Sequence, residues 1–246
     1  MINPDARALL TVVQATWPAY AQQSLGPWIL RDGRGGGKRA SAATACGPVT
    51  HADLAAAEVA MRAMGQRPCF MIRDGDAAID ALLAQASYEV IDPVAMYAAP
   101  LVDLAMDTPE PTASFHIWEP LAIQREIWAG GGIGPARVAV MNRVHGAKTA
   151  LLGRKDGRAA ATGFAAIHDG MAMVHALEVL PVYRRQGTAR ALMLEAARWA
   201  APLGARYLAV VCTEANTAAN ALYASMGMHR VGRYHYRQQP QAGESA

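Results

Sequence analysis

Short apolar runs alternate along this chain with stretches rich in alanine and leucine, most clearly in its second half. Residues 173–180 read Met-Val-His-Ala-Leu-Glu-Val-Leu and predict a mostly buried strand. Residues 189–202 are rich in strong helix formers and predict a helix directly after that strand. A second buried strand over 207–212 precedes a predicted helix over 216–228. The pattern therefore indicates an α/β protein.

The first half and the middle of the chain carry the same pattern less regularly. The three glycines at 35–37 predict a mobile hairpin tip between two strands, and Asp53 stands where a helix N-cap is expected. The glycine-rich residues 130–135 are expected to form a loop. We expect helices over 6–16, 53–64, 77–86 and 119–128, and strands over 27–31, 39–45, 69–73, 88–97, 138–144, 149–154 and 159–167.

Two segments that lie far apart along the chain resemble each other. Residues 69–72, followed by an alanine-rich helix from Asp76, match residues 208–211, followed by a similar helix from Asn216. The offset in numbering is 216 − 76 = 140 between the helices and 208 − 69 = 139 between the strands. We infer an internal duplication of a strand–helix–strand unit.

The segment 184–189, Arg-Arg-Gln-Gly-Thr-Ala, joins the strand over 173–180 to the helix that follows. A loop that ends in glycine at a helix start leaves several backbone N–H groups unpaired, at the positive end of the helix dipole. Such a site suits a pyrophosphate, and Gly187 lets the phosphates approach the backbone closely. The small side chains of Thr188 and Ala189 keep this approach open, and Arg184, Arg185 and Arg190 add positive charge.

Polar residues follow one face of the helix over 216–228. Asn216, Asn220 and Tyr223 stand at spacings of four and three, so they share that face. A helix of this kind is typical of a cleft wall. The alternative interpretation is an N-cap, a solvated asparagine and a half-buried tyrosine.

Together the strand, the turn and the asparagine–tyrosine spacing over 171–237 resemble the core of the GNAT superfamily of acetyl-CoA-dependent N-acetyltransferases. The turn has Ala189 where glycine is commoner. The resemblance implies that the strand pairs with the pantetheine arm, that the turn holds the pyrophosphate, and that Tyr223 gives a proton to the departing thiolate. The implied cofactor-binding residues are Leu177, Glu178, Val179, Arg184, Arg185, Gln186, Gly187, Thr188, Ala189, Arg190, Asn216 and Asn220.

A general base is also expected, because an ammonium group cannot attack a thioester. Strand alternation predicts that Met173, His175, Leu177 and Val179 share one face, with Glu178 on the other. His175 titrates near neutral pH when unperturbed and resembles the catalytic histidine of the arylalkylamine N-acetyltransferases, which makes it the candidate base, acting through water. The alternative is a buried, hydrogen-bonded core histidine. The N–H of Val179 is the candidate for polarising the thioester oxygen.

The first half resembles the degenerate half of tandem bacterial GNAT proteins through Trp28-Ile-Leu-Arg31 and Lys38-Arg39-Ala40-Ser41. Under the helix offset, Tyr223 corresponds to Leu83, and the arginine-rich turn corresponds to residues 44–49, which carry no positive charge. We expect a degenerate domain over 1–107, a linker over 108–116 and a catalytic domain over 117–246. The first half has a structural role or helps to wall the acceptor pocket.

Composition restricts the remaining functions. The net charge of the 246 residues is only +3, and no dense basic stripe appears, so nucleic acid is not an expected partner. The three scattered cysteines have no metal spacing and indicate a reducing compartment. With no signal peptide and no long apolar stretch, we expect a cytoplasmic protein that binds no membrane and no metal. A homodimer stays possible.

We therefore expect an α/β protein with the GNAT fold, in which helices flank a mixed, mostly antiparallel twisted sheet and two GNAT-like halves stand in tandem. The expected reaction transfers acetyl from acetyl-CoA to a primary amine of a small molecule or a protein N-terminus, by direct attack in a ternary complex. Two alternatives stay open: a non-catalytic acetyl-CoA-binding sensor, and an acyltransferase that uses a different acyl-CoA.

Overall fold

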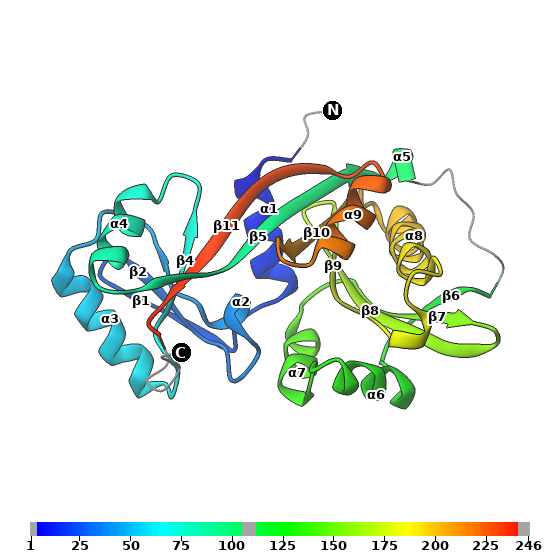
Figure 1. The fold of residues 1–246 in the computed structure, drawn as a ribbon, viewed down its shortest axis with the longest axis horizontal. Helices are drawn as coiled ribbons and strands as arrows, with labels where there is room; N and C mark the ends of the chain where they lie inside the picture. The colour runs from blue at the N-terminus through cyan, green and yellow to red at the C-terminus, as the bar shows by residue number, and fades with distance from the viewer. Residues whose placement is uncertain (1–3, 105–111, 241–246) are drawn as a thin grey trace.

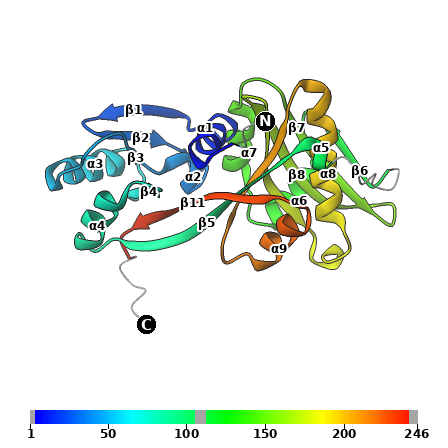
Figure 2. The same cartoon turned by 90° about the horizontal axis from the view of Figure 1, so that it is seen from above.

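Two long strands, β5 (Glu89–Pro100) and β11 (His229–Gln238), run side by side between the two lobes of the molecule (Figures 1 and 2). The computed structural model describes residues 4–104 and 112–240. Its strands form a three-stranded sheet in the order β1-β2-β3 and an eight-stranded sheet in the order β4-β11-β5-β10-β9-β8-β7-β6. The predicted mixed, mostly antiparallel sheet flanked by helices is confirmed.

The amino-terminal lobe packs helices α3 and α4 around a cluster of buried rings. Trp28 and Phe70 have ring centroids 4.8 Å apart, and Phe70 meets Tyr88 at 5.4 Å. Helix α1 begins at Asp5, whose carboxylate accepts a hydrogen bond from the N–H of Ala8, and lies between the lobes (Figure 1). The elements before β5 are α1 (Ala6–Thr16), β1 (Ala21–Leu25), β2 (Trp28–Asp32), α2 (Lys38–Ser41), β3 (Thr44–Ala45), α3 (His51–Ala63), β4 (Cys69–Arg73) and α4 (Ala77–Gln85).

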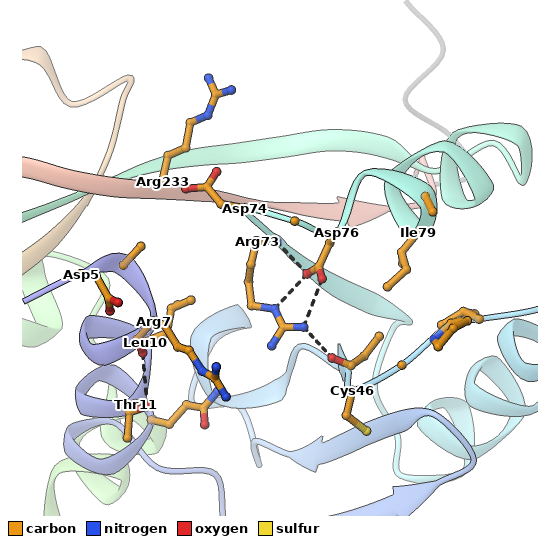
Figure 3. A pocket seen from close by; sticks show the side chains of 18 residues that line it. Asp5, Arg7, Leu10, Thr11, Cys46, Arg73, Asp74, Asp76, Ile79 and Arg233 are labelled. Atoms are coloured by element: carbon orange, nitrogen blue, oxygen red, sulfur yellow. Dashed lines mark hydrogen bonds and ion pairs between the residues drawn. The ribbon is translucent and has the colours of Figure 1, made fainter.

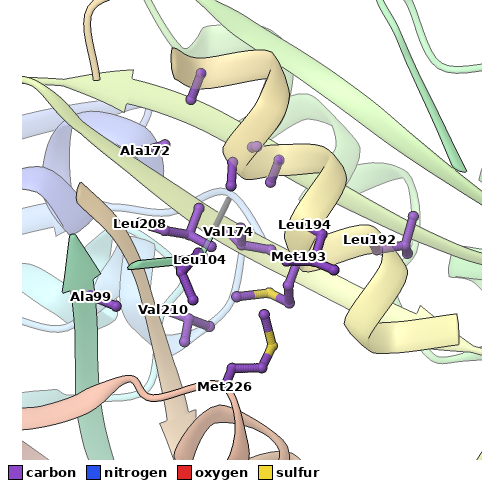
Figure 4. Packing of buried hydrophobic residues seen from close by; sticks show 14 of the residues in the cluster. Ala99, Leu104, Ala172, Val174, Leu192, Met193, Leu194, Leu208, Val210 and Met226 are labelled. Carbon is purple, nitrogen blue, oxygen red and sulfur yellow. The ribbon is translucent and has the colours of Figure 1, made fainter. Parts of the chain in front are cut away.

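The carboxy-terminal lobe is a layer of strands covered on both faces. Helix α8 lies across β6 to β9 and buries Leu192 and Met193 in a core with Val174 and Leu208 (Figure 4). Helices α1 and α6 cover the other face at β8 and β9. The elements after β5 are α5 (Leu101–Leu104), β6 (Ser114–Ile117), α6 (Ala122–Gly130), α7 (Pro135–Arg143), β7 (Lys148–Lys155), β8 (Arg158–His168), β9 (Met171–Val179), α8 (Thr188–Ala200), β10 (Tyr207–Thr213) and α9 (Thr217–Ser225), with short 3-10 turns at Pro181–Tyr183 and Ala201–Leu203.

Each half of the chain gives its last strand to the other half. Strand β11 inserts between β4 and β5, and β5 inserts between β11 and β10, all in antiparallel pairs. The register follows one offset of 140 residues. Cys69 of β4 pairs with Gln238 of β11, and Ala209 of β10 pairs with Ala98 of β5. Each pair thus joins a residue of one copy to a residue of the other, since 69 + 140 = 209 and 98 + 140 = 238. The strands of the duplication therefore share the offset of the helices, and the expected strand offset of 139 is wrong by one position.

Side chains repeat this exchange between the halves. On α9, the Asn220 Oδ1 accepts a hydrogen bond from the Tyr97 hydroxyl of β5 at 2.9 Å. On α4, the Asp80 Oδ1 accepts one from the Arg237 Nε of β11 at 2.7 Å. The two pairs occupy equivalent positions, since 80 + 140 = 220 and 97 + 140 = 237. Each helix thus binds a strand contributed by the opposite half.

The prediction of a strand over 138–144 is wrong, because this segment lies in helix α7. Gly134 is its N-cap, and Pro135 stands at the first helical position, which suits the fixed φ of proline. Val138 and Met141, three residues apart, are both buried. A short apolar run does not by itself distinguish a strand from a buried helix, and the glycine and proline before it were the stronger signal.

The segment 39–45 is also not a strand, since it forms helix α2 and the two-residue strand β3. Gly37 is the N-cap of α2 with a φ of 89°, so the glycines at 35–37 start a helix and form no hairpin tip. The hairpin turn lies instead at Gly26, between β1 and β2. Strand β1 escaped prediction because its Ala-Gln-Gln-Ser-Leu sequence is polar and largely exposed.

Two further expectations concern helix α3 and the middle of the chain. The N-cap of α3 is Thr50, with Asp53 at the third helical position, so the assignment of Asp53 as the cap is wrong by one turn. Residues 108–111 of the predicted linker lie outside the described residues, and Ser114–Ile117 form β6 beside β7. The division into domains over 1–107 and 117–246 stays a prediction.

Candidate active site

A cleft opens where strands β9 and β10 part. Their parallel pairing runs from Met171–Tyr207 to Val174–Val210, whereas β9 continues to Val179 and β10 to Thr213. The cavity in this opening has a volume of about 740 Å³ and lies between the end of β9, the turn before α8, and α9. All the predicted cofactor-binding residues line it except Gln186 and Asn220, and Tyr223 lines it too.

The turn before α8 leaves the helix without a side-chain cap. Gly187 is the N-cap with a φ of 82°, and its residue type allows this left-handed conformation without strain. The first intrahelical bond of α8 runs from the N–H of Ala191 to the carbonyl of Gly187, so the N–H groups of Thr188 and Ala189 have no acceptor within the helix. Arg185 is exposed and makes no hydrogen bond or ion pair with the described residues. These donors suit an anion.

Other side chains of the turn stabilise the turn itself. The Arg184 guanidinium donates to the Val179 carbonyl at 3.1 Å and to the Glu178 carboxylate at 3.3 Å, which holds the end of β9. The Gln186 amide donates to the Val182 carbonyl at 2.9 Å. Thr188 is buried, and its hydroxyl donates to the backbone at 3.3 Å. The side chains of Arg184, Gln186 and Thr188 therefore stabilise the backbone of the turn by hydrogen bonds to its carbonyl groups.

A β-bulge in β9 reorders its side chains. His175 pairs with Phe164 and Glu178 pairs with Thr162, so two residues of β9 face the single Gly163 of β8. The φ of Ala176 is 51° at this point. Before the bulge, His175 faces α1; after it, Leu177 and Val179 pack against the core under α8. The prediction that these residues share one face is wrong, because the bulge changes the alternation.

His175 lies outside the cleft lining and is buried between the halves. Its Nδ1 lies 3.0 Å from Nη1 of Arg39, and its Nε2 lies 2.8 Å from the Thr16 hydroxyl. Arginine only donates, so Nδ1 accepts and the proton sits on Nε2. Burial first, and then the positive charge of Arg39, hold the pKa of His175 well below its usual range. A neutral ring with both nitrogens engaged cannot accept a proton from an amine, so we propose a different base below.

The bulge places Glu178 beside the turn that follows α6. Gly131 permits this approach, since a Cβ built there would lie 2.6 Å from the Glu178 carboxyl group. Glu178 supplies the single carboxylate among the described residues that line the cleft. Glu178 therefore lines the cavity with its carboxyl group close to Gly131, a position that regular alternation does not predict.

Tyr223 reaches the cleft from α9 and is 3% exposed. Its ring centroid lies 5.6 Å from that of Tyr97, a residue of the first half that the sequence did not indicate. Its hydroxyl makes no hydrogen bond within residues 4–104 and 112–240. Burial, followed by the nearby Cys212, raises the pKa of Tyr223 above its ordinary value, so the phenol stays protonated at neutral pH. The hydroxyl of Tyr223 can therefore donate its hydrogen to a ligand in the cleft.

The two asparagines of α9 differ in what they contact. The Asn216 side chain accepts a hydrogen bond from the N–H of Ala219 at 3.1 Å, which confirms it as the N-cap, and it lines the cleft. The Asn220 amide donates to the carbonyls of Thr213 and Asn216 at 2.9 and 2.7 Å. Asn220 therefore joins the end of β10 to α9 and to β5, and its amide is fully engaged.

The comparisons with known proteins agree with this geometry. A model of the acetyltransferase (GNAT) family matches residues 111–228, which include β9, the turn, α8, β10 and α9. Residues 111–228 of the chain therefore match a GNAT acetyltransferase domain. An uncharacterized N-acetyltransferase of Bacillus subtilis (strain 168), YobR, is 25% identical over 244 residues, covering 95% of this chain and 98% of the relative.

Solved structures show the same fold over the whole GNAT chain. A GCN5-related N-acetyltransferase from Kribbella flavida superposes with a TM-score of 0.72 at 19% identity, covering 100% of this chain and 99% of the other. A tandem GNAT protein from the clavulanic acid biosynthesis pathway gives a TM-score of 0.60 at 15% identity, covering 97% and 89%. The prediction of two GNAT-like halves in tandem is confirmed.

GNAT enzymes use acetyl-CoA, and the residues of the cleft fit an anionic nucleotide of this kind. The uncapped start of α8 and the exposed Arg185 match a pyrophosphate, and the unpaired edge of β9 offers amide groups to an extended amide chain. No group of metal-binding side chains occurs among the described residues, and none of their helices is long and apolar enough to cross a membrane.

A second cavity, of about 940 Å³, occupies the corresponding place in the first half of this GNAT protein (Figure 3). It lies between α1, the residues after β3, and the start of α4. Its Arg73 is paired, donating to the Asp76 carboxylate at 2.8 Å and to the Ala45 carbonyl. Three arginines and three aspartates line it: Arg7, Arg73, Arg233, Asp5, Asp74 and Asp76.

Proposed function

We propose that this protein transfers the acetyl group of acetyl-CoA to a primary amine of a small molecule or a protein N-terminus, by direct attack in a ternary complex. One observation carries the proposal: the opening between β9 and β10 unites the uncapped start of α8 with the buried phenol of Tyr223 in a single cavity. A binding module alone would have no use for a proton donor at that place.

The edge of β9 would hold the pantetheine arm. The N–H of Leu180 donates to the Ala160 carbonyl of β8 at 2.9 Å. Because successive backbone amides in a strand point to opposite edges, the N–H groups of Leu177 and Val179 point toward the opening. The carbonyl of Val179 accepts a hydrogen bond from the Arg184 side chain, so Arg184 must release this carbonyl if the pantetheine arm pairs with Val179. The pyrophosphate would lie against Arg185 and the N–H groups at the start of α8.

The side chains divide the chemistry between them. Acetyl-CoA, the acyl donor, supplies the thioester carbonyl and the thiolate leaving group. Glu178 accepts a proton from the incoming ammonium, so that the neutral amine can attack, and the N–H of Val179 polarises the thioester oxygen. Tyr223 keeps its proton at neutral pH and passes it to the sulfur as the C–S bond breaks, and the second proton that the attacking nitrogen loses returns to the phenol. Burial raises the pKa of the Cys212 thiol to about 11, which agrees with attack that uses no cysteine.

A screen of amines tests this function. We expect thiol release from acetyl-CoA, above the rate of hydrolysis, with at least one class of primary amine and none with the corresponding tertiary amine. The Glu178→Gln variant should lose about 10²- to 10⁴-fold in turnover at neutral pH, the size of a general-base contribution. Tight acetyl-CoA binding without turnover on any amine would instead favour the sensor function.

A further inference from the structure

Arg39, a residue of the first half, lies near the proposed acetyl-transfer site, close enough for its positive charge to act on Tyr223 and Cys212. It belongs to α2, and its Nη1 donates to the Nδ1 of His175 at 3.0 Å. His175 is the first residue of β9 beyond the last parallel pair with β10. The guanidinium carbon also lies 5.9 Å from the centroid of the Trp17 ring, which itself stacks 5.0 Å from His175. The positive charge of Arg39 therefore lies close to the point where β9 and β10 separate.

This cation has no anionic partner in the described part of the chain. Arg39 forms no ion pair there, and its Nε is inaccessible and makes no hydrogen bond. Arginine does not lose its charge in proteins, and a buried charge without a counter-charge is costly. Arg31, buried in the same half, also lacks a counter-charge and donates to the Ala42 carbonyl and the Thr44 hydroxyl at 2.9 and 3.0 Å, but Arg39 differs in that its Nε has no acceptor.

The segment from the end of α6 through α7 lies beside both Glu178 and the loop that leads to Arg39. The loop before α2 packs against α7, where a Cβ built on Gly36 would lie 2.5 Å from Val140. Glu178 faces the turn between α6 and α7 on the same side. Arg39 itself keeps part of its surface accessible, although atoms surround the guanidinium closely. Glu178 and the residues just before Arg39 therefore lie against one continuous segment, the turn after α6 and helix α7.

We propose that Arg39 binds a carboxylate carried by the amine acceptor, so that the acceptor is an amino acid or a similar compound with both groups. This inference rests on the proposed function. The amine is held at Glu178 and the carboxylate at Arg39, which supplies the counter-charge that the protein does not. The first half thereby takes part in choosing the substrate, and His175 serves as a positioning residue that fixes the guanidinium.

Matched pairs of acceptors test the inference. For each amino acid, kcat/KM is compared with that of its α-carboxamide, in wild type, Arg39→Gln and Arg39→Lys. We expect wild type to prefer the acid, Arg39→Gln to lower that preference by about 10- to 100-fold, as for a lost charge-assisted hydrogen bond, and Arg39→Lys to keep part of it. The ratio within one preparation does not depend on how much protein is folded. Arg34→Gln is the control, since Arg34 is exposed and paired with Asp32.

The outcomes separate the two proposals. Turnover in which wild type uses acids and amides alike, or in which Arg39→Gln lowers both equally, overturns the carboxylate site and leaves the acetyltransferase function standing. No turnover with any amine defeats the proposed function. The carboxylate site is then decided by calorimetric titration of the amino acids and their amides in the presence of coenzyme A, where binding of the acids must depend on Arg39.

Discussion

Helices α3 and α8 begin beside equivalent cavities in the two halves, yet their N-termini are capped differently. The Thr50 hydroxyl accepts from the N–H of Asp53 at 3.2 Å, and the Asp53 carboxylate accepts from the N–H of Thr50 at 2.9 Å. The hydrogen bond from the Thr50 side chain lowers the pKa of Asp53, so a negative charge stays at the helix start. Gly187 gives α8 neither a cap nor a charge. A helix end that the chain caps itself is closed to an external anion, whereas one left bare can bind it.

The charges that line the two cavities follow the same division. The cavity of the second half carries Arg184, Arg185 and Arg190 against the single carboxylate of Glu178, a formal balance of 3 − 1 = +2. The cavity of the first half carries three arginines and three aspartates, a balance of 3 − 3 = 0. We expected residues 44–49, the counterpart of the arginine-rich turn, to carry no positive charge, and they carry none. The arginines of this cavity come from α1, β4 and β11, and aspartates offset them.

The largest expected difference between the halves comes from Tyr223, which corresponds to Leu83 in the first copy. The Tyr223→Phe variant removes the proton donor and should lower kcat by about 10²- to 10⁴-fold, while the affinity for acetyl-CoA stays unchanged. Steady-state thiol release and calorimetric binding measure the two quantities. Tyr97→Phe, on the adjacent ring, is the matched control and should cost much less. Equal kcat in wild type and Tyr223→Phe would remove this residue from the mechanism.

The next effect concerns the charge at the bare helix start. Arg185→Ala should weaken acetyl-CoA binding by about 1.5–3 kcal/mol, the size of a charge-assisted hydrogen bond. Isothermal titration calorimetry measures it. Arg62→Ala is the control, because Arg62 is half exposed on α3 of the first half and pairs with Glu58. Unchanged affinity in Arg185→Ala would contradict the placement of the pyrophosphate.

Removing the cap of α3 tests the other side of the comparison. Thr50→Ala exposes the start of that helix and should lower the free energy of unfolding by about 1 kcal/mol, a typical loss for an N-cap. Urea denaturation measures the loss. Acetyl-CoA affinity should not change, because the cofactor binds the other half. A clear fall in that affinity would show that the assignment of the two cavities is reversed.

The smallest effect lies in the paired contacts that join the halves. Hydrogen bonding from Arg237, and then from His235, lowers the pKa of Asp80, whose counterpart is the neutral Asn220. A lowered pKa means that the stabilisation is complete above the unfolded value of about 3.9 and is lost as the pH falls through the folded value. Asp80→Asn should therefore cost about 0.5–1 kcal/mol at pH 7 and almost nothing near pH 2. Urea denaturation at both pH values measures it, and a loss independent of pH would contradict the ionic interpretation.

Local signals explain what the sequence could predict. Gly187 and its arginines, and the spacing from Asn216 to Tyr223, lie within one turn or one helix, so their placement in the cleft follows from neighbouring residues alone. The bulge at Ala176 has no such signal, because it arises from the pairing of β9 with β8, and it moved Leu177, Glu178 and Val179 from their expected faces. Arg39 and Tyr97 reach the site only through contacts with residues that are distant along the chain.

The exchange of strands also determines when each half can be completed during synthesis. Strand β4 leaves the ribosome long before β11, the strand that pairs with it, so the sheet of the first lobe has an open edge until β11 has been made. An unpaired edge of this kind invites association with other chains, which gives a nascent molecule a period of exposure to aggregation. Neither lobe can complete its part of the shared sheet before β11 has been made, since β5 and β11 join the two lobes.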